Sequence, residues 1–157
     1  MPLPAHLLRR RVLGAATVLA ALTLTACSPG LSVDSYPTEK GSEVGCGALY
    51  ADLPRTVGGL DSILVEDDVA AAWGTPAVVL RCGVGEPDAL EPTSRCDMVA
   101  DVGWFTETTH DGFLFTTIGR EFSVSVEVPE AHAPAADVLV DLAGSIEKHD
   151  PDEEPCV

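Results

Sequence analysis

The chain has 157 residues, of which 46% are hydrophobic, and it carries 9 lysines and arginines against 25 aspartates and glutamates. This length suits one small domain with a leader. The formal charge of −16 excludes a broad nucleic-acid-binding surface, which requires clustered basic side chains. The same charge argues against electrostatic attraction to anionic lipid headgroups. We therefore expect an acidic domain with no nucleic acid among its partners.

The first 26 residues have the pattern of an export signal. The basic run Arg9–Arg11 precedes fifteen uncharged residues, Val12–Ala26. A permanent membrane span needs about 20 apolar residues, so this shorter stretch is typical of a signal peptide. The sequence Leu24–Cys27 (LTAC) resembles the bacterial lipobox. This resemblance implies cleavage after Ala26 and a diacylglyceryl group on Cys27, whereas the alternative is an ordinary secretory signal followed by a chance cysteine.

Removal of the leader makes the protein still more acidic. The leader contains three arginines and no acid, so the mature chain retains six basic and 25 acidic residues, a formal charge of −19. Residues 28–45, rich in proline, glycine and serine, predict a flexible tether of roughly 20–25 Å. We predict a signal peptide at 1–26, a tether at 27–45 and one folded domain at 46–157, held at the outer face of the cell membrane by acylated Cys27.

Four cysteines remain for the domain: Cys46, Cys82, Cys96 and Cys156. An even number outside the cytosol favours two disulfides, and four cysteines allow three connectivities. Period-two alternation places Cys82 and Cys96 on the apolar faces of two predicted strands. We therefore expect a Cys82–Cys96 bridge at the base of a long hairpin, which leaves Cys46 for Cys156. A four-thiolate metal site, the alternative, would lack any C-x-x-C pair.

Hydrophobic periodicity predicts an α+β fold. Alternating patterns predict strands at 77–84, 96–105, 113–118 and 122–128, the last two joined by a turn at Gly119-Arg120. Helical patterns predict a helix from Pro134 to Pro151 and two shorter helices, at 46–53 and 66–73. Strands joined in succession form a meander. We expect a four-stranded antiparallel meander with the helices packed mainly on one face.

Several short motifs resemble those of a known family. They are Trp73–Pro76 (WGTP), Leu80–Val84 (LRCGV), Cys96, Trp104, Thr116–Arg120 (TTIGR) and Val126–Pro129 (VEVP). Together they resemble an uncharacterised family of actinobacterial lipoproteins and secreted proteins, the domain-of-unknown-function family numbered thirty-five fifteen. The resemblance covers roughly residues 46–144. It implies an envelope location, but no established activity and no catalytic residue to carry over.

The sequence contains no strong catalytic or cofactor motif. It lacks G-x-S-x-G, C-x-x-C and a glycine-rich loop followed by lysine. His110, His132 and His149 are scattered without the spacing of metal ligands, and the acidic runs Glu66–Asp68 and Asp150–Glu154 lack the alternating ligands of a calcium loop. We expect neither a metal nor a cofactor.

Three residues are candidates for binding: Arg81, Arg120 and Trp104. Arg81 is predicted to share a sheet face with Asp97 and Asp101, which favours a cross-strand ion pair. The alternative is that Arg81 binds a carboxylate or phosphate of a partner. Trp104 is expected in the core, with ligand stacking as the alternative.

We expect a non-catalytic envelope lipoprotein whose sheet face around Arg81 meets an envelope protein or a cell-wall component. That face mixes apolar and polar residues, so it is either covered by residues 46–64 or is an interaction patch. The alternative is a cell-wall hydrolase that uses Asp97 and Asp101, predicted at roughly 6–7 Å between α-carbons on one strand face. Arg81 beside them would keep both carboxylates ionised, which argues against a general acid.

Overall fold

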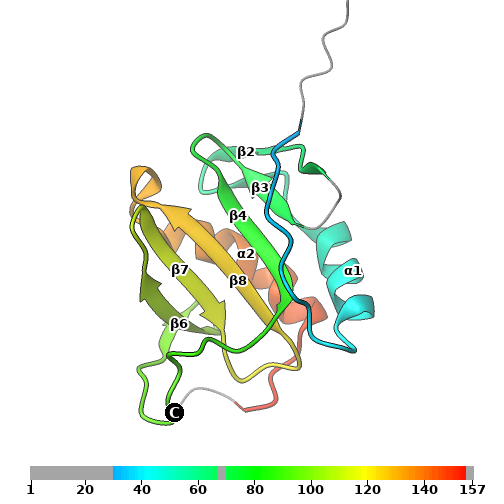
Figure 1. The fold of residues 1–157 in the computed structure, drawn as a ribbon, viewed down its shortest axis with the longest axis vertical. Coiled ribbons are helices and arrows are strands. Elements are labelled where there is room, and N and C mark those ends of the chain that lie inside the picture. Colours follow the sequence, from blue (N-terminus) through cyan, green and yellow to red (C-terminus); the bar gives the residue numbers. More distant parts are fainter. Residues whose placement is uncertain (1–29, 67–69, 155–157) are drawn as a thin grey trace, which may run out of the picture.

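One antiparallel sheet with two α-helices forms the part of the chain that the computed structural model describes, residues 30–66 and 70–154. The predicted signal peptide, Cys27 and Cys156 therefore lie outside the described residues. The elements run α1 (Glu43–Asp52), β1 (Thr56–Val57), β2 (Leu60–Ile63), β3 (Ala71–Trp73), β4 (Val78–Val84), β5 (Asp97–Val99), β6 (Val102–Thr108), β7 (Gly112–Thr117), β8 (Ser123–Pro129), the 3-10 turn η2 (Glu130–His132) and α2 (Ala136–His149) (Figure 1).

The sheet has eight strands in these ranges, in the order β1-β2-β3-β4-β8-β7-β6-β5. Two antiparallel meanders, β1 to β4 and β5 to β8, meet where β4 pairs with β8. The predicted four-stranded meander is therefore wrong, because β4 pairs with β3 and β8 and not with β5, the next strand along the chain. The two central strands bury valine and leucine side chains on the same face, and their pairing places the most apolar strands in the middle of the sheet.

The predicted strand 96–105 is a hairpin rather than one strand. Ala100 and Asp101 both have left-handed backbone angles, with φ of 48° and 65°, and form the two-residue turn between β5 and β6. Val99 then pairs with Val102, and Asp97 pairs with Trp104. Across this two-residue turn each odd-numbered residue of β5 pairs with an even-numbered residue of β6, and paired residues point to the same face of the sheet. In one uninterrupted strand, odd-numbered and even-numbered residues would instead point to opposite faces. Asp97 consequently lies on the face of Trp104 and not on that of Arg81.

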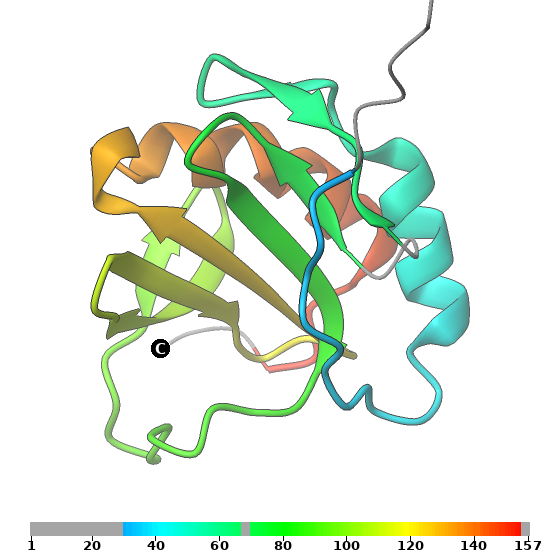
Figure 2. The same ribbon diagram turned by 45° about the horizontal axis from the view of Figure 1, so that its top comes forward.

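The main core lies between the sheet and the helices. Leu139, Leu142 and Ile146 of α2 are fully buried against it, and the side chains of Trp73 and Trp104 are buried beneath them. Figure 2 shows α2 along one face of the sheet with α1 beside it. The periodicity located α2 correctly. The predicted helix 66–73 is wrong, because Ala71–Trp73 is β3, paired on both sides with β2 and β4.

A disulfide joins α1 to β4, between Cys46 and Cys82. It excludes the predicted Cys82–Cys96 and Cys46–Cys156 bridges. It is the one disulfide whose two cysteines both lie among the described residues, and Cys96 is also disulfide-bonded. The reason is topological: β4 and β5 are separated by β8, β7 and β6, so Cys82 lies about 19 Å from β5 at ordinary strand spacing. A disulfide requires α-carbons within about 7 Å. The 5.6 Å between the α-carbons of Cys46 and Cys82 meets this condition.

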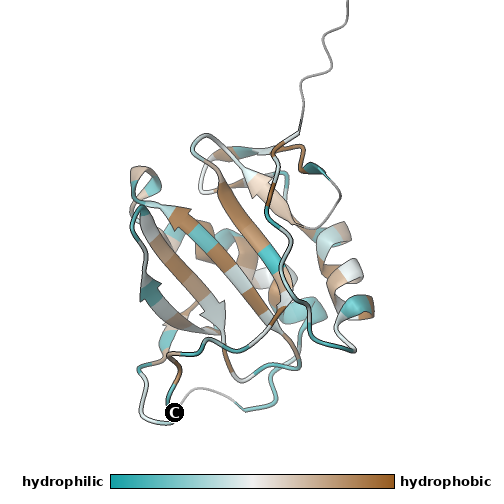
Figure 3. Ribbon diagram, in the orientation of Figure 1, coloured by the Kyte–Doolittle hydropathy of each residue, from teal (hydrophilic) through white to brown (hydrophobic). Residues whose placement is uncertain are grey.

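The other face of the sheet is crossed by residues 30–42, which we call the strap (Figure 1). Its first part pairs with Val65, and its later part bonds through Glu39 to Gly83. A small second cluster lies under the strap and contains Val65, Ala70, Ala72 and Val79, with Leu31 and Val33 packed against it. The composition of this stretch predicted only a tether. Figure 3 shows the alternation of hydrophobic and hydrophilic residues along β8, whose polar residues face the strap side.

Candidate binding groove on the strap side of the sheet

A groove of about 310 Å³ lies between the strap and the sheet. We call it the strap groove, and its lining residues are Asp34, Ser35, Tyr36, Arg81, Val84, Gly85, Pro87, Glu107, Leu114, Thr116 and Ser125. Leu114, Thr116 and Ser125 come from β7 and β8, where the even positions of β7 and the odd positions of β8 point away from α2. The mixed face recognised from the sequence is thus covered by the strap, and not by residues 46–64.

Arg81 lies at the centre of this groove and is held from two sides. Its Nη1 donates to Glu127 Oε2 on the neighbouring strand β8 at 3.4 Å, and its guanidinium lies 5.9 Å from the ring centroid of Tyr36. The side chain of Arg81 is 21% exposed and that of Glu127 is 44% exposed. The predicted ion pair of Arg81 with Asp97 or Asp101 is therefore wrong, because both aspartates are remote from β4. Arg81 pairs with Glu127 instead. A pair this exposed contributes under about 1 kcal/mol.

Two tyrosines fix the strap to β4 at Cys82. The backbone N–H of Cys82 lies 3.2 Å from the hydroxyl oxygen of Tyr36 and 3.1 Å from that of Tyr50, and Tyr36 donates to the carbonyl of Cys82 at 3.0 Å. Burial raises the pKa of the Tyr50 phenol, and its hydrogen bond with Tyr36 raises that pKa further. The Tyr50 phenol therefore acts as a neutral hydrogen-bonding group, and the disulfide beside it keeps α1 and β4 together.

The charge in the strap groove favours a cationic ligand over an anionic one. Asp34 and Glu107 line the groove, and Glu127 already neutralises Arg81. An acidic groove attracts ammonium or guanidinium groups and repels carboxylates and phosphates. The hypothesis that Arg81 binds an anionic partner therefore loses support. Tyr36 and Glu127 were not among the candidates from the sequence: the parity of β8 points Glu127 toward this side, but no pattern places Tyr36 over Arg81.

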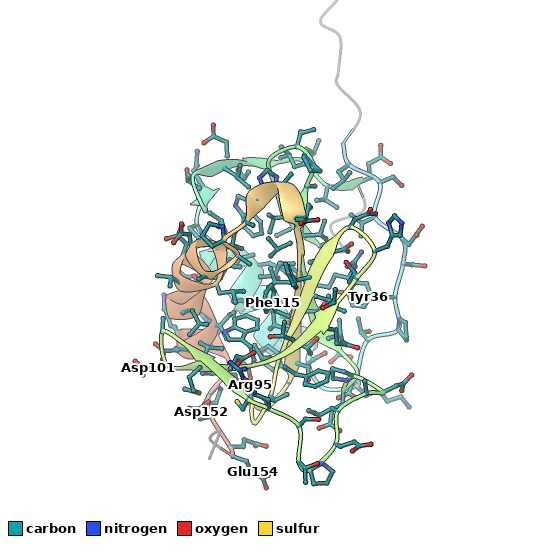
Figure 4. The ribbon with its side chains drawn as sticks, turned by 90° about the vertical axis from the view of Figure 1, so that its left-hand side faces the viewer. Tyr36, Arg95, Asp101, Phe115, Asp152 and Glu154 are labelled. Carbon is teal, nitrogen blue, oxygen red and sulfur yellow. A yellow bond between two sulfur atoms is a disulfide. The ribbon has the colours of Figure 1, made fainter. Side chains whose placement is uncertain are left out.

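Trp104 lies on the opposite side of the sheet, in the core (Figure 4 shows Tyr36 and Phe115 on opposite sides). Its ring meets that of Phe115 edge to face, at 6.4 Å between centroids. Both rings line a second cavity of about 350 Å³ between β5–β7 and the start of α2. The rim of this cavity carries an ion pair between Arg95 and Asp97, at 2.6 Å. Trp104 is thus a core residue, as expected, and does not adjoin the strap groove.

Arg120 holds the C-terminal stretch in place rather than facing solvent. Its side chain is only 2% exposed, pairs with Asp152 at 3.1 Å and donates to the carbonyl of Asp150. Burial raises the pKa of the Asp150 carboxyl to about 6, and the N–H of Phe122 and the charge of Arg120 oppose this rise. Arg120 also donates to the carbonyl of Asp101 at 3.3 Å. The structure therefore separates Arg81, Trp104 and Arg120 instead of combining them in one site.

Asp97 and Asp101 do not lie side by side on one strand face, as the hypothesis of a cell-wall hydrolase required. Asp97 lies on the helix side and accepts a hydrogen bond from Thr106, whereas Asp101 is in the β5–β6 turn. Within residues 30–66 and 70–154, no group of three or more His, Cys, Asp or Glu residues could hold a metal ion. Over the same ranges, no helix is long and apolar enough to span a membrane. The strap groove, which contains Arg81, remains the candidate binding site.

Comparison with known proteins gives a family and no ligand. The family model described as "Protein of unknown function (DUF3515)" matches residues 9–155. This match extends beyond the region of the short motifs and includes both the strap and the acidic C-terminal stretch. No curated protein and no solved structure matches the chain.

Proposed function

The chain belongs to the DUF3515 family, and we propose that it is a lipid-anchored protein of the bacterial cell envelope that acts as a non-catalytic binding or accessory module. The observation that carries this proposal is the leader, in which a basic run, a short uncharged stretch and LTAC end at Cys27. A diacylglyceryl group with a further acyl chain, such as palmitate, anchors a protein stably, whereas one chain alone binds only marginally.

Two features of the folded part support an extracytoplasmic location. The Cys46–Cys82 disulfide suits an oxidising compartment, because cytosolic reductants keep such thiols reduced. The two cysteines are 36 residues apart in the sequence, and the bond between them joins α1 to the centre of the sheet. The strongly acidic surface suits a soluble domain that does not adhere to anionic lipids through its charge.

The strap groove is the proposed binding site of this module. Its residues combine a hydrogen-bonding wall of Thr116 and Ser125 with the apolar side chain of Leu114. Asp34 and Glu107 add negative charge to its lining. We propose as its ligand a positively charged segment of an envelope protein, or a cell-wall component that bears free amino groups.

Replacement of the anchor residue tests the location. Cys27→Ala removes the only thiol at the lipobox, so we expect the variant to leave the membrane fraction or to accumulate as an uncleaved precursor. Metabolic labelling with a fatty acid and fractionation of the cells measure both outcomes, and the unchanged chain is the control. A Cys27→Ala variant that is still processed and acylated would contradict the proposal.

Site-specific photo-crosslinking tests the binding site. A photoreactive amino acid at Leu114 lies in the strap groove, while the same group at Val140 lies on the exposed side of α2, where that valine is 52% exposed. We expect partners captured from native membranes at position 114 and not at position 140. Equal capture at both positions, or capture at position 140 alone, would contradict a binding role for the groove.

A further inference from the structure

The strap leaves almost no free chain between the lipobox and the folded domain. The backbone N–H of Leu31 donates to the carbonyl of Leu64 at 2.7 Å, and the carbonyl of Leu31 accepts from the N–H of Glu66 at 2.9 Å. These two bonds form a parallel bridge between Leu31 and Val65. The side chain of Leu31 also packs against the cluster around Val65. Leu31 is therefore a fixed point of the domain and not part of a flexible tether.

The spacing along the chain then limits how far the domain can stand from a lipid on Cys27. Leu31 is the fourth residue after Cys27, and an extended chain covers at most about 3.3–3.6 Å per residue, or about 14 Å in total. This length is well below the tether of residues 28–45 predicted from composition. It exceeds the thickness of one lipid headgroup layer by only about 6–9 Å, since headgroups add about 5–8 Å to each side of the hydrocarbon core.

An exposed apolar side chain lies at this same end of the domain. Leu64, whose carbonyl bonds to Leu31, is 70% exposed. In Figure 1 the described chain begins beside β2, at the end of the molecule opposite the last described residues. An exposed leucine next to a membrane anchor is favourably placed for burial in the interfacial layer of the bilayer.

We propose that the end of the domain formed by the strap start and residues 64–66 after β2, with Leu64 at its surface, rests on the bilayer. The inference rests on the lipid anchor proposed above. The charge of the domain does not supply the contact, because Asp61 and Glu66 on either side of Leu64 are exposed acids that anionic headgroups repel. The short connection to Cys27 supplies it, and the opposite end of the sheet, with the β5–β6 and β7–β8 turns, is held away from the membrane.

Tryptophan quenching by brominated lipids tests the proposal. Leu64→Trp and the control Met98→Trp are each made in the full chain, purified with the native anchor and reconstituted in phosphatidylcholine vesicles. Met98 is an apolar side chain of β5, 55% exposed, on the opposite edge strand of the sheet. The native Trp73 and Trp104 are 1% and 0% exposed, so the unchanged chain supplies the background.

We expect quenching at position 64 to exceed that at position 98 several-fold, and to fall to the level of position 98 when a twelve-residue Gly-Ser segment is inserted after Pro29. Equal quenching at 64 and 98 in the short chain would overturn the orientation, as would quenching at 64 that the insertion leaves unchanged. Intact mass measurement separates the two proposals. An acylated Leu64→Trp protein whose introduced tryptophan is not quenched refutes the orientation alone, and a protein without the acyl groups refutes the anchor as well.

Discussion

The two faces of the sheet use the same strands for different purposes. On the helix side, Leu80, Val124 and Val126 are fully buried beneath α2 and contribute to one continuous core. On the strap side, the alternate residues of the same strands are Arg81, Ser125 and Glu127, covered by a single extended segment. The helix side is held by the main apolar core, and the strap side by a small apolar cluster and a few hydrogen bonds. The core on the helix side and the proposed binding groove therefore lie on opposite faces, and changes on the two faces should have different consequences.

The largest effect is expected in the helix-side core. Leu142 of α2 is fully buried, so Leu142→Ala should lower the free energy of unfolding by about 2–5 kcal/mol through lost burial and the cavity that remains. Urea denaturation measures this loss. Val140→Ala on the exposed side of the same helix is the matched control, with an expected change within about 0.5 kcal/mol. Similar losses for both variants would contradict the placement of α2.

The disulfide should have the next largest effect, because it connects α1 to the central strand. The double change Cys46→Ala and Cys82→Ala should lower the free energy of unfolding by about 2–4 kcal/mol, since the unfolded chain regains the entropy of a loop with a sequence separation of 36 residues. Denaturation with and without reductant measures the effect. Peptide mapping under non-reducing conditions should recover Cys46 joined to Cys82, and recovery of Cys82 joined to Cys96 would contradict the topology.

Asp150 should make stability depend on pH where the C-terminal stretch closes over Arg120. Its carboxyl has a pKa of about 6 in the folded protein and about 4 when unfolded, so the folded state binds more protons between these values. The stability that Asp150 contributes is present below pH 4 and is lost as the pH rises through about 6. Relative to Asp150→Asn, the wild type should lose on the order of 2 kcal/mol across this window. Parallel pH profiles of unfolding for the two proteins would contradict this account.

The smallest effect is expected on the strap side. Arg81→Met keeps the length of the side chain but removes the partly exposed ion pair with Glu127, so stability should change by at most about 1 kcal/mol. Thermal unfolding measures the change, and crosslinking from position 114 reports whether the groove still binds. A loss of several kcal/mol would show that the strap side carries stability as the helix side does.

The sequence was most informative where burial follows a local period. The spacing of Leu139, Leu142 and Ile146 predicted α2, and alternation predicted β7 and β8. Pairing between distant strands has no such local signal, so the β4–β8 contact and the disulfide that accompanies it were missed. Local propensity also misled at Ala71–Trp73, where an alanine-rich run favours a helix but pairing with β4 makes it a strand.

The candidate site depended on features that the sequence pattern could not supply. The turn at Ala100 and Asp101 contains no glycine, so nothing in the pattern marked the point where the alternation inverts. This single turn moved Asp97 to the other face and gave Arg81 a different partner, Glu127. The strap was missed for a related reason. Its composition is typical of a linker, and it packs through backbone hydrogen bonds and isolated side chains such as Tyr36.

The mass of the first peptide of the protein, released from the cell membrane fraction, is the most direct test of the central claim that this is a lipid-anchored envelope protein. The account predicts a mature chain that begins at Cys27 and carries a diacylglyceryl group on that residue. A chain with an unmodified N-terminus at any other position, or one that retains the arginines of the leader, would contradict it.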